Sequence, residues 1–183
     1  MSPRQCLCEN AQGRIRREDR SLSMLKIGDA APLFEAKDET GTSVRLSDLR
    51  GRKVVLYFYP MDGTPGCTAE ACSFRDTHSH FVDRNTTVLG ISGDGERSHR
   101  RFKARHGLPF SLLSDPGRKI ARAYGALGER RLLGIRFAWP RRATFVIDEK
   151  GVVEAAHHSV RVPGHASALL DELGESAERL GIE

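Results

Sequence analysis

The sequence has few cysteines and few aromatic residues, and it has no long hydrophobic run. Four cysteines in 183 residues are too few for the dense disulfide framework that stabilises small secreted domains. No apolar stretch approaches the ~18 residues needed to cross a bilayer. The first residues also lack the apolar segment of a secretory signal. We therefore expect a cytoplasmic protein with no membrane partner.

Basic residues outnumber acidic ones, and the formal net charge is +5 at pH 7. The basic residues concentrate at residues 97–105 and 130–142. A basic surface can bind nucleic acid, but no zinc finger, helix-turn-helix or RNP motif accompanies this charge. Acidic residues are also interleaved through much of the chain. The charge favours a solvated basic face, with a surface that attracts an acidic protein as the alternative. No nucleic-acid partner is predicted.

The chain divides into a short extension and one domain of ordinary size. Residues 1–23 are rich in arginine, have few large apolar residues and show no hydrophobic period, which is typical of disorder. Cys6 and Cys8 lie there, and this pair could hold a metal or form a strained disulfide. No other cluster of possible ligands stands beside it. We predict a disordered basic extension over residues 1–23 and a folded domain over residues 24–183.

Strand and helix patterns alternate along the domain. Short β-favouring segments flank two turns and predict hairpins, while continuous apolar runs predict buried strands. The predicted strands are residues 34–36, 43–46, 54–59, 87–92, 111–113, 144–147 and 152–156. The predicted helices are residues 67–84, 96–106, 119–126 and 164–180. This alternation predicts one α/β domain with a central mixed β-sheet flanked by helices.

The segment at residues 60–67, PMDGTPGC, connects a buried strand to the next helix. It places Cys67 at the helix start, where unpaired N–H groups and a partial positive charge favour the nucleophilic thiolate. Pro60 stiffens the loop, and Gly66 lets the backbone come close to a substrate. The Thr64 hydroxyl can accept a hydrogen bond from a peroxide while donating to the thiolate. A buried structural cysteine after a turn fits Cys67 equally well.

A second cysteine, Cys72, follows Cys67 by five residues on the same predicted helix. Helical geometry places the two α-carbons roughly 8–9 Å apart and about 140° around the axis. A disulfide needs α-carbons within about 7 Å, so a bond between them requires the first helical turns to unwind. The spacing also excludes the C-x-x-C motif of a thioredoxin-type reductase.

The stretch YFYPMDGTPGCTAEACSFRD, residues 57–76, resembles the active-site signature of peroxiredoxins. It is most similar to the peroxiredoxin Q, or bacterioferritin comigratory protein, subfamily. Pro60, Thr64 and Cys67 match the motif P-x-x-x-T-x-x-C, and Cys72 matches the resolving cysteine of many members. The letters MDG after Pro60 depart from the more usual charged residues, which should alter the loop but not the reaction.

The resemblance extends over about residues 24–180 and implies a thioredoxin-like fold. It continues in GISGD, FSLLSDP and RATFVIDEKG. It implies that Arg142 lies beside Cys67, where a guanidinium would stabilise the thiolate and polarise a peroxide. Arg141 would point to the opposite face of its strand. Glu70 matches a position that holds this arginine by a salt bridge, with an exposed acid at the helix start as the alternative.

The resemblance further implies a thiol peroxidase, an atypical 2-Cys peroxiredoxin. Cys67 would reduce hydrogen peroxide and organic hydroperoxides through a sulfenic acid, and Cys72 would then form a disulfide that thioredoxin reduces. No metal or organic cofactor is expected, because sulfur is the redox centre and the seven histidines match no zinc pattern. We expect a monomer. A non-enzymatic redox sensor or holdase that uses the same thiols is the alternative function.

Overall fold

The computed structural model describes residues 25–132 and 135–179. The predicted extension at residues 1–23, with Cys6 and Cys8, lies outside these ranges. The strands are β1 (Glu35–Lys37), β2 (Ser43–Arg45), β3 (Lys53–Phe58), β4 (Thr86–Ser92), β5 (Ser111–Ser114), β6 (Leu127–Leu132), β7 (Ile135–Pro140), β8 (Ala143–Ile147) and β9 (Val153–His157). The helices are the 3-10 helix η1 (Leu46–Leu49) and the α-helices α1 (Pro65–Asp76), α2 (His78–Asp83), α3 (Glu96–His106), α4 (Lys119–Ala123) and α5 (His165–Arg179).

Seven of the strands form one mixed sheet in the order β2-β1-β5-β4-β3-β8-β9. Strands β3, β4 and β5 run parallel, while β8 is antiparallel to β3 and β9 is antiparallel to β8. Every residue of β8 is buried, as are five of the six residues of β3, which explains why both read as continuous apolar runs. The predicted mixed sheet is therefore confirmed.

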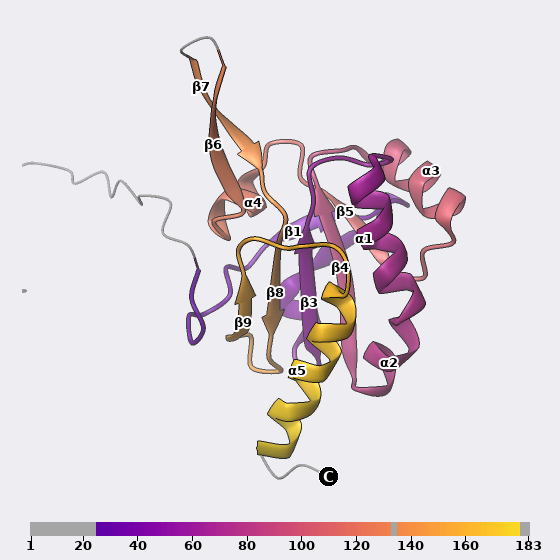
Figure 1. Cartoon of the computed structure of the whole chain (residues 1–183), viewed down its shortest axis with the longest axis vertical. Helices are drawn as coiled ribbons and strands as arrows, with labels where there is room; N and C mark the ends of the chain where they lie inside the picture. Colours follow the sequence, from indigo (N-terminus) through magenta and orange to yellow (C-terminus); the bar gives the residue numbers. More distant parts are fainter. Residues whose placement is uncertain (1–24, 133–134, 180–183) are drawn as a thin grey trace, which may run out of the picture.

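Helices cover both faces of this sheet (Figure 1). On one face, Phe74 of α1, Phe81 of α2, Phe102 of α3 and Leu169 of α5 share a buried apolar cluster with alternate residues of the central strands. On the other face, α4 and η1 pack on the remaining strand residues. This layered arrangement is the thioredoxin-like architecture that the resemblance implied.

The structure differs from the prediction at one helix and at one hairpin. The helix predicted over residues 67–84 is divided at Thr77, whose hydroxyl donates to the carbonyl oxygen of Ser73 at 2.9 Å; such local bonds compete with the helical ladder. The hairpin of β6 and β7 was not predicted, because its arginine-rich sequence does not alternate clearly. Figure 1 shows this hairpin extending away from the main sheet.

The strand register brings two distant segments together at the carboxyl end of β3. The chain leaves β3 there, passes through the loop that begins at Pro60 and enters α1. Because β8 is antiparallel to β3 with Ala143 opposite Phe58, Arg142 stands beside this loop. In open α/β sheets, ligands gather at the carboxyl ends of strands. Within the described residues, no helix is both long and apolar enough to cross a membrane.

Candidate active site

Cys67 is the third residue of α1 and is almost fully buried. Thr64 is the N-cap, in the extended conformation, and Pro65 occupies the first helical position, where its missing N–H has no intrahelical role. Cys67 has an exposed fraction of 1% and forms no disulfide. Its sulfur therefore lies in the first helical turn, where free backbone N–H groups favour negative charge.

Arg142 lies directly against this cysteine. Its Nη2 donates to Cys67 Sγ at 3.3 Å, and its Nη1 donates to Glu70 Oε2 at 2.6 Å. A Cβ atom at Gly66 would lie 2.7 Å from Nη2 of Arg142, so a larger residue would displace the guanidinium. The prediction that Gly66 lets the backbone come close to a substrate stays a prediction, and the structure adds that the missing side chain leaves room for Arg142.

Glu70 holds Arg142 from inside the protein rather than from the surface. Its exposed fraction is 1%, so the alternative of an exposed acid at the helix start is wrong. Burial raises the pKa of Glu70 to about 7, although the charge of Arg142 opposes this shift. Oε1 of Glu70 has no hydrogen-bond partner among the described residues. The carboxyl group of Glu70 therefore gains or loses its negative charge near neutral pH.

The loop before the helix corrects one expectation. The Thr64 hydroxyl donates to the carbonyl oxygen of Met61 at 3.3 Å, not to Cys67 as predicted. The Thr64 side chain does not cap the helix, and the Thr64 carbonyl oxygen accepts the first helical hydrogen bond, from the N–H of Thr68, at 2.9 Å. Pro60 is half-buried at the end of β3. The loop turns at Gly63, whose φ of +72° is strained for side chains with a Cβ.

Cys72 lies on the same helix but faces a different side. It is partly exposed, is a free thiol, and lines a groove of about 410 Å³ between α1 and the start of α5. Val162, Pro163 and Gly164 line the same groove. Because α1 is continuous through both cysteines, a bond between them requires the helix to open.

The sequence reasoning missed a buried network beneath the loop. The carboxylate of Asp62 accepts hydrogen bonds from Tyr59 Oη at 2.8 Å, Ser98 Oγ at 2.7 Å and His99 Nδ1 at 2.9 Å. The Asp62 N–H donates to Asp94 Oδ2 at 2.9 Å. Burial alone would raise the pKa of Asp62. The hydrogen bond and charge of His99, together with the hydrogen bonds from Ser98 and Tyr59, outweigh burial and lower this pKa overall.

This network fastens the active-site loop to α3. His99 is fully buried, with an exposed fraction of 0%, although it belongs to a highly charged helix. The available sequence signal was the spacing of His99 and Phe102, which puts both on one helical face. Among the described residues, no group of three or more His, Cys, Asp or Glu residues could hold a metal ion.

Fold and site together define a class of protein. A thioredoxin-like domain places one thiol at a helix start, an arginine against its sulfur, and a second thiol one and a half turns further along. A thiolate stabilised in this way is a nucleophile toward oxidants, and a nearby thiol can resolve the product. The chain is a thiol-based oxidoreductase.

Comparison with known proteins identifies the family. The model of the AhpC/TSA family matches residues 27–156. A putative peroxiredoxin bcp of Coxiella burnetii is 42% identical over 149 residues, covering 81% of this chain and 99% of the relative. Peroxiredoxin Bcp of Bacillus subtilis is 39% identical over 155 residues, with coverages of 85% and 99%.

The solved structures agree with this result. A structure of peroxiredoxin Q from Xanthomonas campestris has a TM-score of 0.79 and 34% identity, covering 84% of this chain and 98% of that chain. The chain therefore belongs to the AhpC/TSA family, in its peroxiredoxin Q and Bcp branch. It is a thiol peroxidase, and the findings do not support the non-enzymatic sensor or holdase.

Proposed function

We propose that Cys67 is the peroxidatic residue and attacks hydrogen peroxide and organic hydroperoxides. The thiolate sulfur bonds to one peroxide oxygen and the O–O bond breaks. That oxygen remains on sulfur as the sulfenic acid, and the other leaves with a proton as water or an alcohol. The sulfur loses two electrons and the peroxide gains them. A study of the Xanthomonas campestris relative concerned its alkyl peroxide reduction activity, which supports the inclusion of organic substrates.

Arg142 assists this step by donating hydrogen bonds to the atoms that carry negative charge during the attack. The 3.3 Å contact between its Nη2 and the sulfur stabilises the thiolate, and a donor beside the sulfur can also reach a peroxide oxygen. Glu70 holds the guanidinium in place through the 2.6 Å ion pair. Thr64 can turn its hydroxyl from Met61 toward a bound peroxide. The contact between Arg142 and Cys67 is the observation that carries the proposal.

Cys72 completes the cycle as the resolving residue. Its thiol attacks the sulfenic sulfur of Cys67, the S–S bond forms and water leaves. A dithiol protein, thioredoxin, then reduces this disulfide and becomes a disulfide itself. We further propose that the enzyme acts as a monomer in the cytoplasm and that residues 24–183 form its peroxiredoxin domain.

A coupled peroxidase assay with thioredoxin, its reductase and NADPH tests the proposal. Cys67→Ser should abolish turnover, because serine has no accessible nucleophilic anion at neutral pH. Cys72→Ser should consume about one equivalent of peroxide and then stall. Replacing both Cys6 and Cys8 by serine is the matched control and should leave turnover unchanged. Near wild-type turnover by either single variant would refute its assignment.

A further inference from the structure

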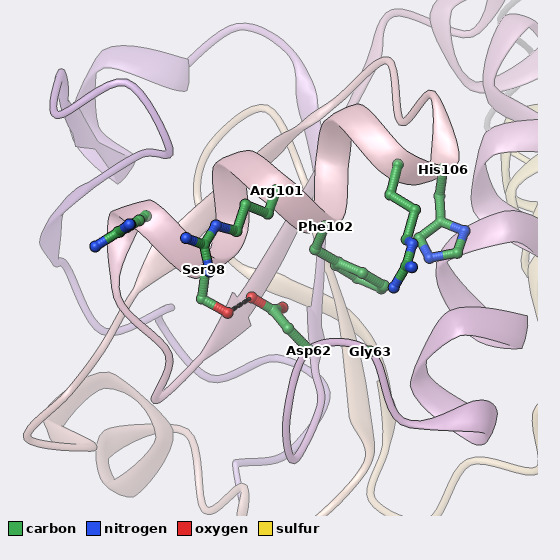
Figure 2. A pocket seen from close by; sticks show the side chains of 8 residues that line it. Asp62, Gly63, Ser98, Arg101, Phe102 and His106 are labelled. Atoms are coloured by element: carbon green, nitrogen blue, oxygen red, sulfur yellow. Dashed lines mark hydrogen bonds between the residues drawn. The ribbon is translucent and has the colours of Figure 1, made fainter.

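A groove of about 590 Å³ lies beside the active-site loop and takes no part in the chemistry proposed above. One wall is the loop at Asp62 and Gly63, and the other is α3. Figure 2 shows Arg101 and Phe102 on the side of α3 that faces this loop, with the bond from Ser98 to Asp62 dashed. The groove therefore borders the segment that leads into Cys67.

Three arginines line the α3 side of this groove at intervals of one helical turn. Arg97, Arg101 and Arg105 repeat every four residues, so they share one face of the helix. All three are exposed, and none forms an ion pair or side-chain hydrogen bond with another described residue. Two other cations of α3 do have partners in the protein. Lys103 forms an ion pair with Glu39, and Arg100 donates a hydrogen bond to the carbonyl oxygen of Glu39.

The exposed charge of the groove is of one sign. Asp62 is the only acidic residue among those that line it, and its carboxylate is occupied by Tyr59, Ser98 and His99. Its side chain is only 6% exposed. The groove thus presents three free guanidinium groups, which bind carboxylates in paired geometry.

The dimensions favour a protein surface over a small anion. Arg105 follows Arg97 by eight positions, which corresponds to about 12 Å along the helix axis. The three guanidinium groups are spread along this length, so several acidic residues on a folded partner can pair with them at the same time. An acidic partner seated here would contact the Asp62–Gly63 loop, next to the helix start that must open to expose the disulfide.

We propose that the face formed by Arg97, Arg101 and Arg105, the arginine face, is the docking surface for an acidic dithiol protein that reduces the enzyme. This inference rests on the proposed function, because it assigns a binding surface to the reductant of that cycle. The arginine face attracts the partner by charge and brings it to the mouth of the active-site loop. Electrostatic attraction of this kind raises association rates by about 10 to 10³.

The test measures reduction of the oxidised enzyme in a single turnover. The protein is oxidised with one equivalent of hydrogen peroxide and mixed with an excess of an acidic bacterial thioredoxin that has been reduced beforehand. The second-order rate constant is divided by the rate constant obtained with dithiothreitol, an uncharged small dithiol. For the variant carrying Arg97→Glu, Arg101→Glu and Arg105→Glu, this ratio should fall at least tenfold.

The matched control changes the same number of cations elsewhere. Arg52, Arg122 and Lys150 are exposed and do not line the groove, so the variant with glutamate at all three has the same net charge as the arginine-face variant. Its ratio should stay within twofold of the wild type. An equal fall in both variants, or no fall in either, would overturn the proposal.

Two further readouts do not depend on the folding of the charge-reversed variant. The triple glutamine variant of the arginine face should give an intermediate ratio. For the wild type, raising the salt from 20 to 500 mM should slow thioredoxin but not dithiothreitol; a salt-independent thioredoxin rate would contradict the proposal. Salt-sensitive binding of duplex DNA, lost in the arginine-face variant without a change in the ratio, would assign the face to nucleic acid instead. Absence of peroxide consumption with dithiothreitol would refute the proposed function itself.

Discussion

Nη2 of Arg142 donates a hydrogen bond to Sγ of Cys67 across 3.3 Å. The two residues are 75 positions apart in the sequence, and the antiparallel pairing of β3 with β8 brings them together. The close approach depends on Gly66, where any Cβ would collide with the guanidinium. The arginine contact and the helix start act on the same sulfur, and both favour its anion.

Replacing Arg142 by alanine should slow the attack on peroxide on the order of a hundredfold, the usual cost of one lost donor to a developing charge. Arg142→Lys should recover only part of this rate, because an ammonium group cannot bind sulfur and Glu70 with the same planar geometry. The measurement is the second-order rate constant of the reduced protein with hydrogen peroxide. Arg141→Ala is the neighbouring control, and an equal loss there would contradict the assignment.

The raised pKa of Glu70 predicts a pH dependence of stability. Its folded pKa of about 7 exceeds the ordinary value of 4.5, so the folded state holds a proton that the unfolded state releases between these values. The stabilisation by the protonated form is complete below about pH 4.5 and is lost as pH rises to about 7. Relative to Glu70→Gln, the wild type should lose stability across this window and then change no further.

Urea denaturation of the two proteins at pH 4.5, 6 and 8 measures this difference. Both should carry Cys67→Ser, which removes the active-site thiol from the comparison. A difference that is independent of pH would show that Glu70 does not titrate in this window. A wild type that gains stability with rising pH would mean that Arg142 outweighs burial and keeps the carboxyl ionised.

The network below the loop predicts an effect on both stability and rate. Asp62→Ala leaves the hydroxyls of Tyr59 and Ser98 and the ring of His99 without their acceptor, and each unpaired buried group costs about 1–3 kcal/mol. The free energy of unfolding should therefore fall by at least about 3 kcal/mol. Peroxide attack should slow about tenfold, because the loop before Cys67 loses its anchor.

Partial rescue by the amide distinguishes positioning from general damage. Asp62→Asn keeps one acceptor oxygen and should recover part of the rate. Asp76→Ala, at an exposed carboxylate on the same helix as Cys67, should change stability by less than about 0.5 kcal/mol. Peroxide attack at the wild-type rate in Asp62→Ala would show that the network has only a structural role.

The sequence predicted the parts of this protein that local patterns determine. The apolar runs of β3, β4 and β8 and the helix at residues 96–106 were found because burial imposes its period on the sequence. The position of Cys67 at the helix start followed from the loop before it. The pairing of Arg142 with Cys67 and Glu70 came from the family resemblance, since no local pattern relates residues so far apart.

Features set by tertiary contacts were missed. The β6–β7 hairpin pairs mainly with itself, so its strands lack the apolar pattern of a core strand. Gly66 makes room for an arginine from another strand, which sequence cannot show. Asp62 was treated as a loop residue because its partners, Ser98 and His99, lie on α3. The spacing of His99 and Phe102, on one face of a charged helix, was the available signal.

Oxidation should open the start of α1 and little else. Cys67 and Cys72 lie too far apart to bond within an intact helix, and helix starts carry few ladder hydrogen bonds. Hydrogen exchange of the oxidised protein should become faster in residues 65–72 and the loops that touch them, while β3 and β4 stay protected. Regular protection through both cysteines in a disulfide-bonded protein would refute this geometry.

Disulfide mapping tests the central claim most directly. The reduced protein receives one equivalent of hydrogen peroxide, free thiols are then blocked, and the peptides are identified by mass spectrometry. We predict one intramolecular bond between Cys67 and Cys72, with Cys6 and Cys8 recovered as blocked thiols. A bond from Cys67 to Cys6 or Cys8 would instead make the N-terminal segment the resolving arm, and that result would contradict the account.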